Sequence, residues 1–169
     1  MDTGQAFIDR SRSYLKRDYL PKIRLAVQAL STEDIWWRPN GASNSIGNLI
    51  LHLAGNARQW VVSGIGGAPD LRRRQEEFDA QEGLSGTELL ARLEEALEEV
   101  DGTLTSLPGT ELSSKRVIQG LEVSVLDAIY HVVEHFSTHT GQILYISKLR
   151  SGRDLGFWEV KDGKAIPRW

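Results

Sequence analysis

The feature that most constrains the fold is the recurrence of apolar residues at helical spacing along most of the chain. The clearest case lies between residues 85 and 106, where apolar side chains recur every three or four positions and glutamates cover the opposite face. The apolar positions are Leu89, Leu90, Leu93, Leu97, Val100 and Leu104. A helix with one apolar face must bury that face against other elements, so this segment predicts a helical assembly.

Three further segments show the same pattern. We expect a helix over about 3–30 that Pro21 kinks or interrupts, a helix over about 45–63, and a helix over about 122–150. Asn44 or Ser45 is the expected cap of the second of these. Four long helices predict an all-α fold, a four-helix bundle in a single domain that spans residues 1–169.

The connections are expected to be irregular. Residues 31–40 predict a capped short turn followed by a loop, and residues 64–70 contain a clear helix breaker. Residues 111–121 are expected to be extended and rich in turns. The C-terminal tail, residues 151–169, is expected to be irregular and pinned by its aromatic side chains, which are Phe157, Trp158 and Trp169.

Composition excludes several classes of function. The chain has 169 residues, a net charge of −3 and no cysteine, which excludes disulfides, thiolate metal ligands and a cysteine nucleophile. The charge gives no basic surface for nucleic acid, and no apolar run is long enough to span a membrane. Because residues 1–7 lack the features of a signal peptide, we expect a cytoplasmic protein.

All four histidines fall in two of the predicted helices. His52 lies in the second long helix, and His131, His135 and His139 follow at intervals of four in the last one. Residues four apart project from one face of a helix. Because imidazole is the commonest side-chain ligand of transition metals, a histidine pair at this spacing with a remote third histidine predicts a metal site.

A helical wheel places the histidines beside the apolar stripes. At about 100° per residue, His139 and His131 lie about 40° to either side of His135, and apolar residues fill the sector beyond His139. His52 lies beside the apolar stripe of its own helix in the same way. Polar residues share these sectors, and we expect them to line a pocket or support the ligands; they are Asn48, Asn56, Gln59 and Gln142.

Three neutral imidazoles can hold a divalent metal and leave a position open for water or substrate. We expect His52, His135 and His139 to be the ligands, since His139 lies nearer the apolar edge, where a ligand would be buried. His131 and His135 have the same spacing and form the alternative pair; otherwise His131 is a neighbour of the site. A bound metal can lower the pKa of a coordinated water or thiol.

Other motifs are weaker. No serine lies in the strand-to-helix elbow of a hydrolase nucleophile, and no glycine-rich loop has the spacing of a phosphate cradle. Asp127 and Glu134 lie off the histidine face; they are candidates for contacts that support the ligands or for a solvated flank, and the flank is favoured. Residues 72–74 are three arginines, but acidic residues follow at once, so a solvated charged face is favoured over an anion-binding patch.

Two motifs resemble those of the DinB-like superfamily. The first is Asn44-Ser-Ile-Gly-Asn-Leu49 followed by His52-Leu-Ala-Gly-Asn56, and the second is His135-x-x-x-His139-Thr-Gly-Gln-Ile143. The second motif is the more specific. The similarity runs through most of the chain, and within the superfamily the sequence resembles an uncharacterised branch.

The resemblance implies a four-helix bundle of the DinB/YfiT type, often a homodimer. It also implies a divalent metal, commonly nickel or zinc, on His52, His135 and His139. Characterised relatives include transferases and isomerases that use bacterial low-molecular-weight thiols. By resemblance, the metal would stabilise such a thiolate and direct it at an electrophile, and Arg58 and residues 72–74 are candidates for holding an anionic thiol.

Three functions stand as expectations. The first is a metal-dependent enzyme acting on a small molecule, most plausibly a thiol-dependent S-transferase, otherwise a hydrolase. The second is a non-catalytic metal- or ligand-binding sensor or stress protein, in which a fourth ligand such as His131 fills the coordination sphere. The third is a structural or interaction protein whose histidines bind no metal.

Overall fold

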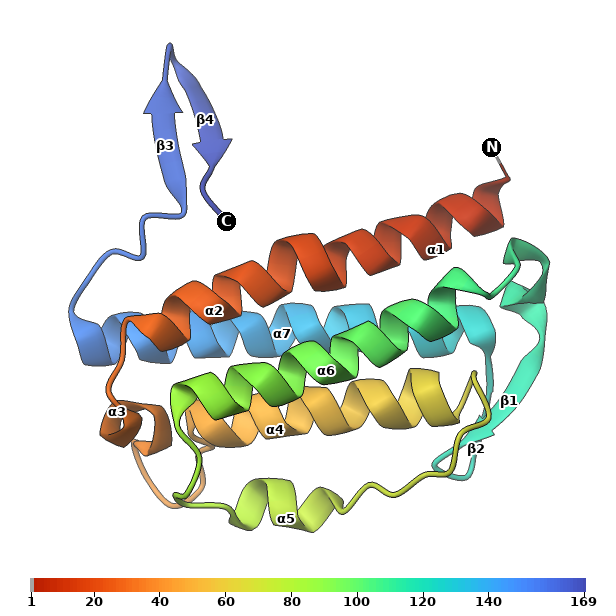
Figure 1. Cartoon of the computed structure of the whole chain (residues 1–169), viewed down its shortest axis with the longest axis horizontal. Coiled ribbons are helices and arrows are strands. Elements are labelled where there is room, and N and C mark those ends of the chain that lie inside the picture. Colours follow the sequence, from red (N-terminus) through yellow and green to blue (C-terminus); the bar gives the residue numbers. More distant parts are fainter. Residues whose placement is uncertain (1) are drawn as a thin grey trace.

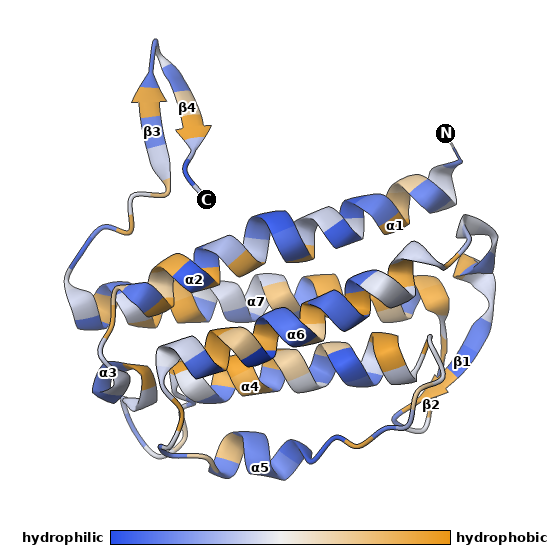
Figure 2. Cartoon of the chain, in the orientation of Figure 1, coloured by the Kyte–Doolittle hydropathy of each residue, from blue (hydrophilic) through white to orange (hydrophobic). Residues whose placement is uncertain are grey.

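Four long helical segments lie side by side around one apolar core in the computed structural model, which describes residues 2–169 (Figure 1). Apolar and polar residues alternate along each helix (Figure 2), and the buried apolar residues of the helices form one core. The segments are α1 (Thr3–Ser13) with η1 (Tyr14–Tyr19) and α2 (Leu20–Gln28), α4 (Ile46–Ala57) with η2 (Arg58–Ser63), α6 (Gly86–Thr105), and α7 (Val125–Ser151). The prediction of a mainly helical chain is confirmed. Within residues 2–169, no helix combines the length and apolar character needed to cross a membrane.

The all-α prediction is wrong in two places. Strands β1 (Lys115–Ile118) and β2 (Leu121–Ser124) form one antiparallel hairpin, and β3 (Trp158–Lys161) and β4 (Lys164–Pro167) form another. Each hairpin turns through two residues with positive φ, which are Gln119 and Gly120 in the first and Asp162 and Gly163 in the second. Two-residue turns of this kind match the twist of paired strands, and Asp-Gly is one of their preferred sequences. The second hairpin therefore had a local signal that the irregular-tail prediction overlooked.

Serine caps set the starts of three long helices. In each, the serine side chain accepts from the backbone N–H three residues later, and the side chain of that later residue accepts from the N–H of the serine. The pairs are Ser45 with Asn48, Ser85 with Glu88, and Ser124 with Asp127. Helix α7 begins at Val125, later than the predicted start near 122, because residues 121–124 pair with β1.

The expected interruption at Pro21 is a change of hydrogen-bond register, not a break. Residues Tyr14–Tyr19 form a π-helical segment, and the N–H of Leu20 bonds to the carbonyl of Leu15, five residues back. Proline lacks an N–H and crowds the preceding turn, and a wider turn accommodates it. The helical path from α1 to α2 is therefore continuous (Figure 1).

The C-terminal hairpin projects away from the helices (Figure 1), and all its strand residues are exposed. Contacts of Trp169, which follows β4, attach the tail to the helices. Its indole N–H donates to Asp18 Oδ1 at 3.2 Å, and Lys22 Nζ lies 3.9 Å from the centre of its ring. The predicted pinning by an aromatic residue thus holds at Trp169.

The connection from η2 to α6 runs along the outer side of α4 and contains the short helix α5 (Arg74–Asp79) (Figure 1). The amide of Asn48 in α4 donates to the carbonyls of Glu77 and Ala80 at 2.8 and 2.7 Å. Arg38, which follows the short helix α3 (Thr32–Trp36), donates to the carbonyls of Phe78 and Ala80 at 2.9 Å each. These hydrogen bonds hold α5 against α4.

Candidate metal centre

His52 of α4 meets His135 and His139 of α7. Each of the three offers a ligand nitrogen, and these atoms all lie within 4.8 Å of one another. The Nε2 atoms of His52 and His135 are 2.8 Å apart. His52 is buried, whereas His135 and His139 are half-buried. The structure thus brings together the three residues that were expected to be ligands.

The apolar stripes of α4 and α7 bring these histidines together. The two helices contact each other directly and contribute buried side chains to the same core. Because the histidines lie in the sector next to each stripe, packing of the stripes leaves their rings facing one another at the edge of the seam. The buried residues that form this packing include Ile46, Ile50 and Leu53 from α4 and Val125, Ile129, Val132 and Phe136 from α7.

The spacing and chemistry of the three imidazoles suit a divalent metal. Tetrahedral coordination with metal–nitrogen bonds of about 2.0–2.1 Å places two ligand nitrogens about 3.3 Å apart. The His52–His135 contact would have to open by only about 0.5 Å to reach that spacing. Three nitrogen ligands leave a further position for water or substrate, as in catalytic zinc sites. Imidazole ligands suit zinc and nickel, among other transition metals.

A buried ion pair lies behind His52. Glu77 Oε2 is 3.0 Å from His52 Nδ1, and Arg72 donates to both carboxylate oxygens of Glu77, at 2.7 Å from Nε and 2.8 Å from Nη2. Arg72 also donates to Gln59 Oε1 at 2.8 Å. The Arg72 and Glu77 side chains are only 4% and 10% exposed. Gly55 leaves room for the pair, because a Cβ at that position would overlap Glu77 Oε1.

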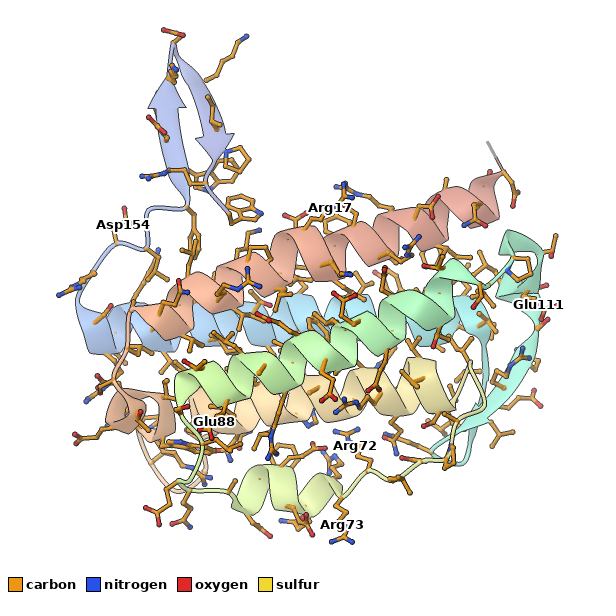
Figure 3. All side chains as sticks on the ribbon, viewed as in Figure 1. Arg17, Arg72, Arg73, Glu88, Glu111 and Asp154 are labelled. Carbon is orange, nitrogen blue, oxygen red and sulfur yellow. The ribbon has the colours of Figure 1, made fainter. Side chains whose placement is uncertain are left out.

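The prediction of a solvated face is therefore wrong for Arg72. Figure 3 shows Arg72 in the space between the connection and α4, whereas Arg73 points away from the helices. The Arg73 side chain is 78% exposed and pairs with Glu76. Neither Glu77 nor Arg72 was expected to contact a ligand histidine. The available signal was Gly55, since a glycine inside a helical pattern costs stability relative to alanine and so points to a packing reason.

The remaining predicted neighbours fall into distinct roles. Gln142 Oε1 is 2.7 Å from His139 Nδ1 and supports that ring directly. Asn56 Nδ2 is 3.2 Å from His131 Nε2, and the ring of His131 lies 4.0 Å from that of Trp60, so His131 stays outside the three-histidine group. Asn48 is fully buried and anchors α5 instead of lining a pocket.

The two flanking carboxylates, Asp127 and Glu134, are on the solvated flank where they were favoured to lie. Glu134 is exposed and accepts a hydrogen bond from Thr138. Asp127 is exposed and caps α7 through Ser124. Neither belongs to the three-histidine group.

Burial favours the neutral form of His135 and His139. Burial, together with the neighbouring His139 and His52, lowers the pKa of His135 to about 3. Burial likewise lowers the pKa values of His131 and His139. For Glu77, burial raises the pKa, but hydrogen bonds from Arg72 and His52 outweigh it and the net shift is downward. At neutral pH His135 and His139 are therefore neutral and Glu77 is ionised, and neutral imidazoles are the form that binds a metal.

A cleft of about 930 Å³ lies on the outer side of α4, beneath the connection that carries α5. Its lining includes apolar side chains such as Leu51 and Val62, and also Gly55, Arg72 and Glu77. The three histidines are not among its lining residues. The buried ion pair thus contacts His52 on one side and the cleft on the other.

Comparison with curated proteins finds no match. Residues 2–164 match a sequence family described as "Protein of unknown function (DUF1572)". The match includes every element from α1 to β3 and all four histidines. Because it spans nearly the whole chain, this protein belongs to the DUF1572 family.

Proposed function

We propose that this protein is a divalent-metal-dependent enzyme, a thiol-dependent S-transferase, with His52, His135 and His139 as the metal ligands. The observation that carries the proposal is the convergence of three imidazole nitrogens within 4.8 Å at the seam of two helices. The DinB-like motifs and the four packed helical segments support the further proposal that the chain is a DinB/YfiT-type bundle with two added hairpins.

A zinc or nickel ion at these histidines would lower the pKa of a coordinated thiol or water and so supply a nucleophile at neutral pH. The chain's own groups orient the ligands: Glu77 contacts His52, and Gln142 contacts His139. His135 and His139 are half-buried, which leaves the centre within reach of a small molecule from solvent. A low-molecular-weight thiol is the substrate class that we propose.

The arginines bear on which thiol would fit. Arg58, Arg72 and Arg73 are each engaged in ion pairs with carboxylates. Within residues 2–169, Arg74 has no such partner; it lies over the ring of Phe78, whose centre is 4.8 Å from that of His52. Arg74 is therefore the arginine that we propose for attracting an anionic thiol. Because Arg74 would attract the thiol and not the metal, an Arg74→Gln variant should raise the KM for an anionic thiol and leave the metal content unchanged.

A non-catalytic metal-binding sensor is the alternative. In that function a fourth protein ligand would close the coordination sphere. His131 was the expected candidate, but its Nε2 atom lies 3.2 Å from the amide nitrogen of Asn56, and its ring packs on Trp60. The geometry supports an open position and hence the enzyme.

Metal analysis and titration test the proposal in two stages. Protein purified without an affinity tag is analysed for metal, and zinc and nickel are then titrated into the parent and into alanine variants at the three ligand positions. His131→Ala is the matched control, since it removes an imidazole one turn from His135. We expect the three ligand variants to lose binding and the control to keep it; ligand variants that bind like the parent contradict the site.

The second stage measures conjugation. Metal-loaded protein is incubated with bacterial low-molecular-weight thiols and an electrophile, and loss of free thiol is followed. Conjugation that requires all three histidines supports the S-transferase. Metal binding without conjugation by any thiol favours the sensor. A homodimer and a cytoplasmic location stay predictions, and light scattering coupled to size-exclusion chromatography measures the first.

A further inference from the structure

The Nδ1 atom of His52 has two polar neighbours at the same distance. Glu77 Oε2 and Arg72 Nη2 each lie 3.0 Å from it. A carboxylate accepts hydrogen bonds and a guanidinium only donates them. A single ring nitrogen cannot donate to the first and accept from the second at once. The two neighbours therefore demand opposite tautomers of His52.

The carboxylate is satisfied in only one of them. With the proton on Nδ1, His52 donates a charge-assisted hydrogen bond to Glu77, while Arg72 keeps both of its bonds to the same carboxylate at 2.7 and 2.8 Å. With the proton on Nε2, the Nδ1 lone pair would face a carboxylate oxygen at 3.0 Å. That contact would bring two acceptors together in a buried site, which is costly.

The tautomer decides whether the Nε2 lone pair of His52 is already free for a metal. His52 Nε2 points at His135 Nε2, 2.8 Å away, on the side where His139 also lies. A proton on Nε2 of His52 would occupy the lone pair that a metal needs. A proton on Nδ1 leaves that lone pair free and aimed between α4 and α7. In metal sites the second ring nitrogen of a ligand histidine commonly donates to a carboxylate in this way.

We propose that Glu77, held by Arg72, is a positioning residue that fixes His52 as the Nδ1–H tautomer and so aims its Nε2 lone pair at the metal position. The proposal rests on the function proposed above in that the metal position is the one formed by the three histidines. The proposal gives a role in the metal site to the connection from η2 to α6, which lies outside the four packed helical segments.

The surrounding structure holds this carboxylate in place. Gly55, one turn after His52, has no Cβ where Glu77 Oε1 lies. Asn48, one turn before His52, donates to the backbone carbonyl of Glu77 at 2.8 Å. Arg72, in the loop before α5, donates hydrogen bonds to both carboxylate oxygens of Glu77. Contacts on both sides of His52 along α4 thus converge on a single acidic side chain.

Long-range nitrogen–proton NMR correlation of the metal-free protein tests the assignment directly, because it reports which ring nitrogen of His52 carries the proton. We expect Nδ1–H in the parent, a loss of that preference in Glu77→Gln, and no change in Glu76→Gln, the matched control one residue earlier and exposed. In Arg72→Gln the carboxylate remains, so His52 should stay in the Nδ1–H form.

Zinc affinity, measured by competition with a chelator, is the second readout. We expect Glu77→Gln to bind zinc about 10–100-fold more weakly than the parent, and Glu76→Gln to bind like the parent. Glu77→Asp keeps the charge on a shorter side chain and should recover part of the loss. This recovery would not follow if residue 77 served only to fill space.

The outcomes separate the two proposals. An Nε2–H tautomer of His52 in the parent, or a Glu77→Gln variant that matches Glu76→Gln in tautomer and zinc affinity, overturns the role of Glu77 and leaves the metal site standing. A parent that binds neither zinc nor nickel, but whose His52 is Nδ1–H and responds to Glu77→Gln, overturns the metal function and leaves the tautomer assignment intact.

Discussion

Replacing Gly55 by alanine should destabilise the protein even though alanine favours helices. The added Cβ would overlap Glu77 Oε1 and would lie 3.0 Å from Arg72 Nε. The carboxylate must then retreat, and it gives up hydrogen bonds of 2.7–3.0 Å to Arg72 and His52. Because the ion pair is almost fully buried, neither group regains full hydration.

The magnitude follows from two opposing effects. Breaking a buried ion pair costs about 3–5 kcal/mol, and replacing glycine by alanine inside a helix gains about 1 kcal/mol. The expected net loss is about 2–4 kcal/mol in the free energy of unfolding. For a chain of this length, that corresponds to a Tm lower by roughly 5–15 °C.

Urea unfolding of metal-free protein, followed by circular dichroism, measures this loss. Gly102→Ala on α6 is the matched control, because nothing lies within 4 Å of the Cβ that it would add. The control should gain about 0.5–1 kcal/mol. If Gly55→Ala gains stability as Gly102→Ala does, Glu77 does not pack against Gly55 and the reasoning about the buried pair is wrong.

Three further predictions follow from the histidines and the core. Burial is the main cause that lowers the pKa of His135 to about 3, so between about pH 6.5 and 3 the unfolded chain binds a proton at His135 that the folded protein does not. The metal-free protein should therefore lose stability as the pH falls through this range. Unfolding measured against pH should show a shallower dependence in His135→Gln than in the parent. With His52 in the proposed Nδ1–H form, the 2.8 Å contact between the two Nε2 atoms requires His135 to donate from Nε2 in metal-free protein, so zinc should move the His135 proton to Nδ1. An NMR correlation that shows Nδ1–H on His135 before zinc is added contradicts this. Phe136→Ala empties a fully buried site and should cost about 3–5 kcal/mol, whereas Tyr145→Ala, at a residue 71% exposed, should change the free energy of unfolding by no more than about 0.5 kcal/mol.

Helical periodicity is a local property, and for that reason the main elements could be predicted from the sequence. The stripe from Leu89 to Leu104 lies in α6, and the cap at Ser45 begins α4 where expected. The same local geometry placed His52, His135 and His139 beside the apolar stripes. Once those stripes packed, the three imidazoles had to face one another.

Residues 115–124 and 158–167 show a limit of that reasoning. Both hairpins turn on short signals, a Gln-Gly and an Asp-Gly pair, that are easily missed when the flanking strands have only four residues each. A helix prediction rests on many residues that repeat at one spacing, whereas the prediction of a two-residue turn rests on a single dipeptide.

The sequence by itself determined that this chain is mainly helical and that the histidines of two helices lie beside apolar stripes, because helix geometry relates side chains only a few residues apart. Only the tertiary structure decided that Glu77 and Arg72 belong behind His52. Their positions depend on the path of the connection across α4, which Asn48 and Gly55 permit and hold. No local spacing encodes that path, since it arises from contacts between segments more than twenty residues apart, such as the hydrogen bond from Asn48 to the Glu77 carbonyl.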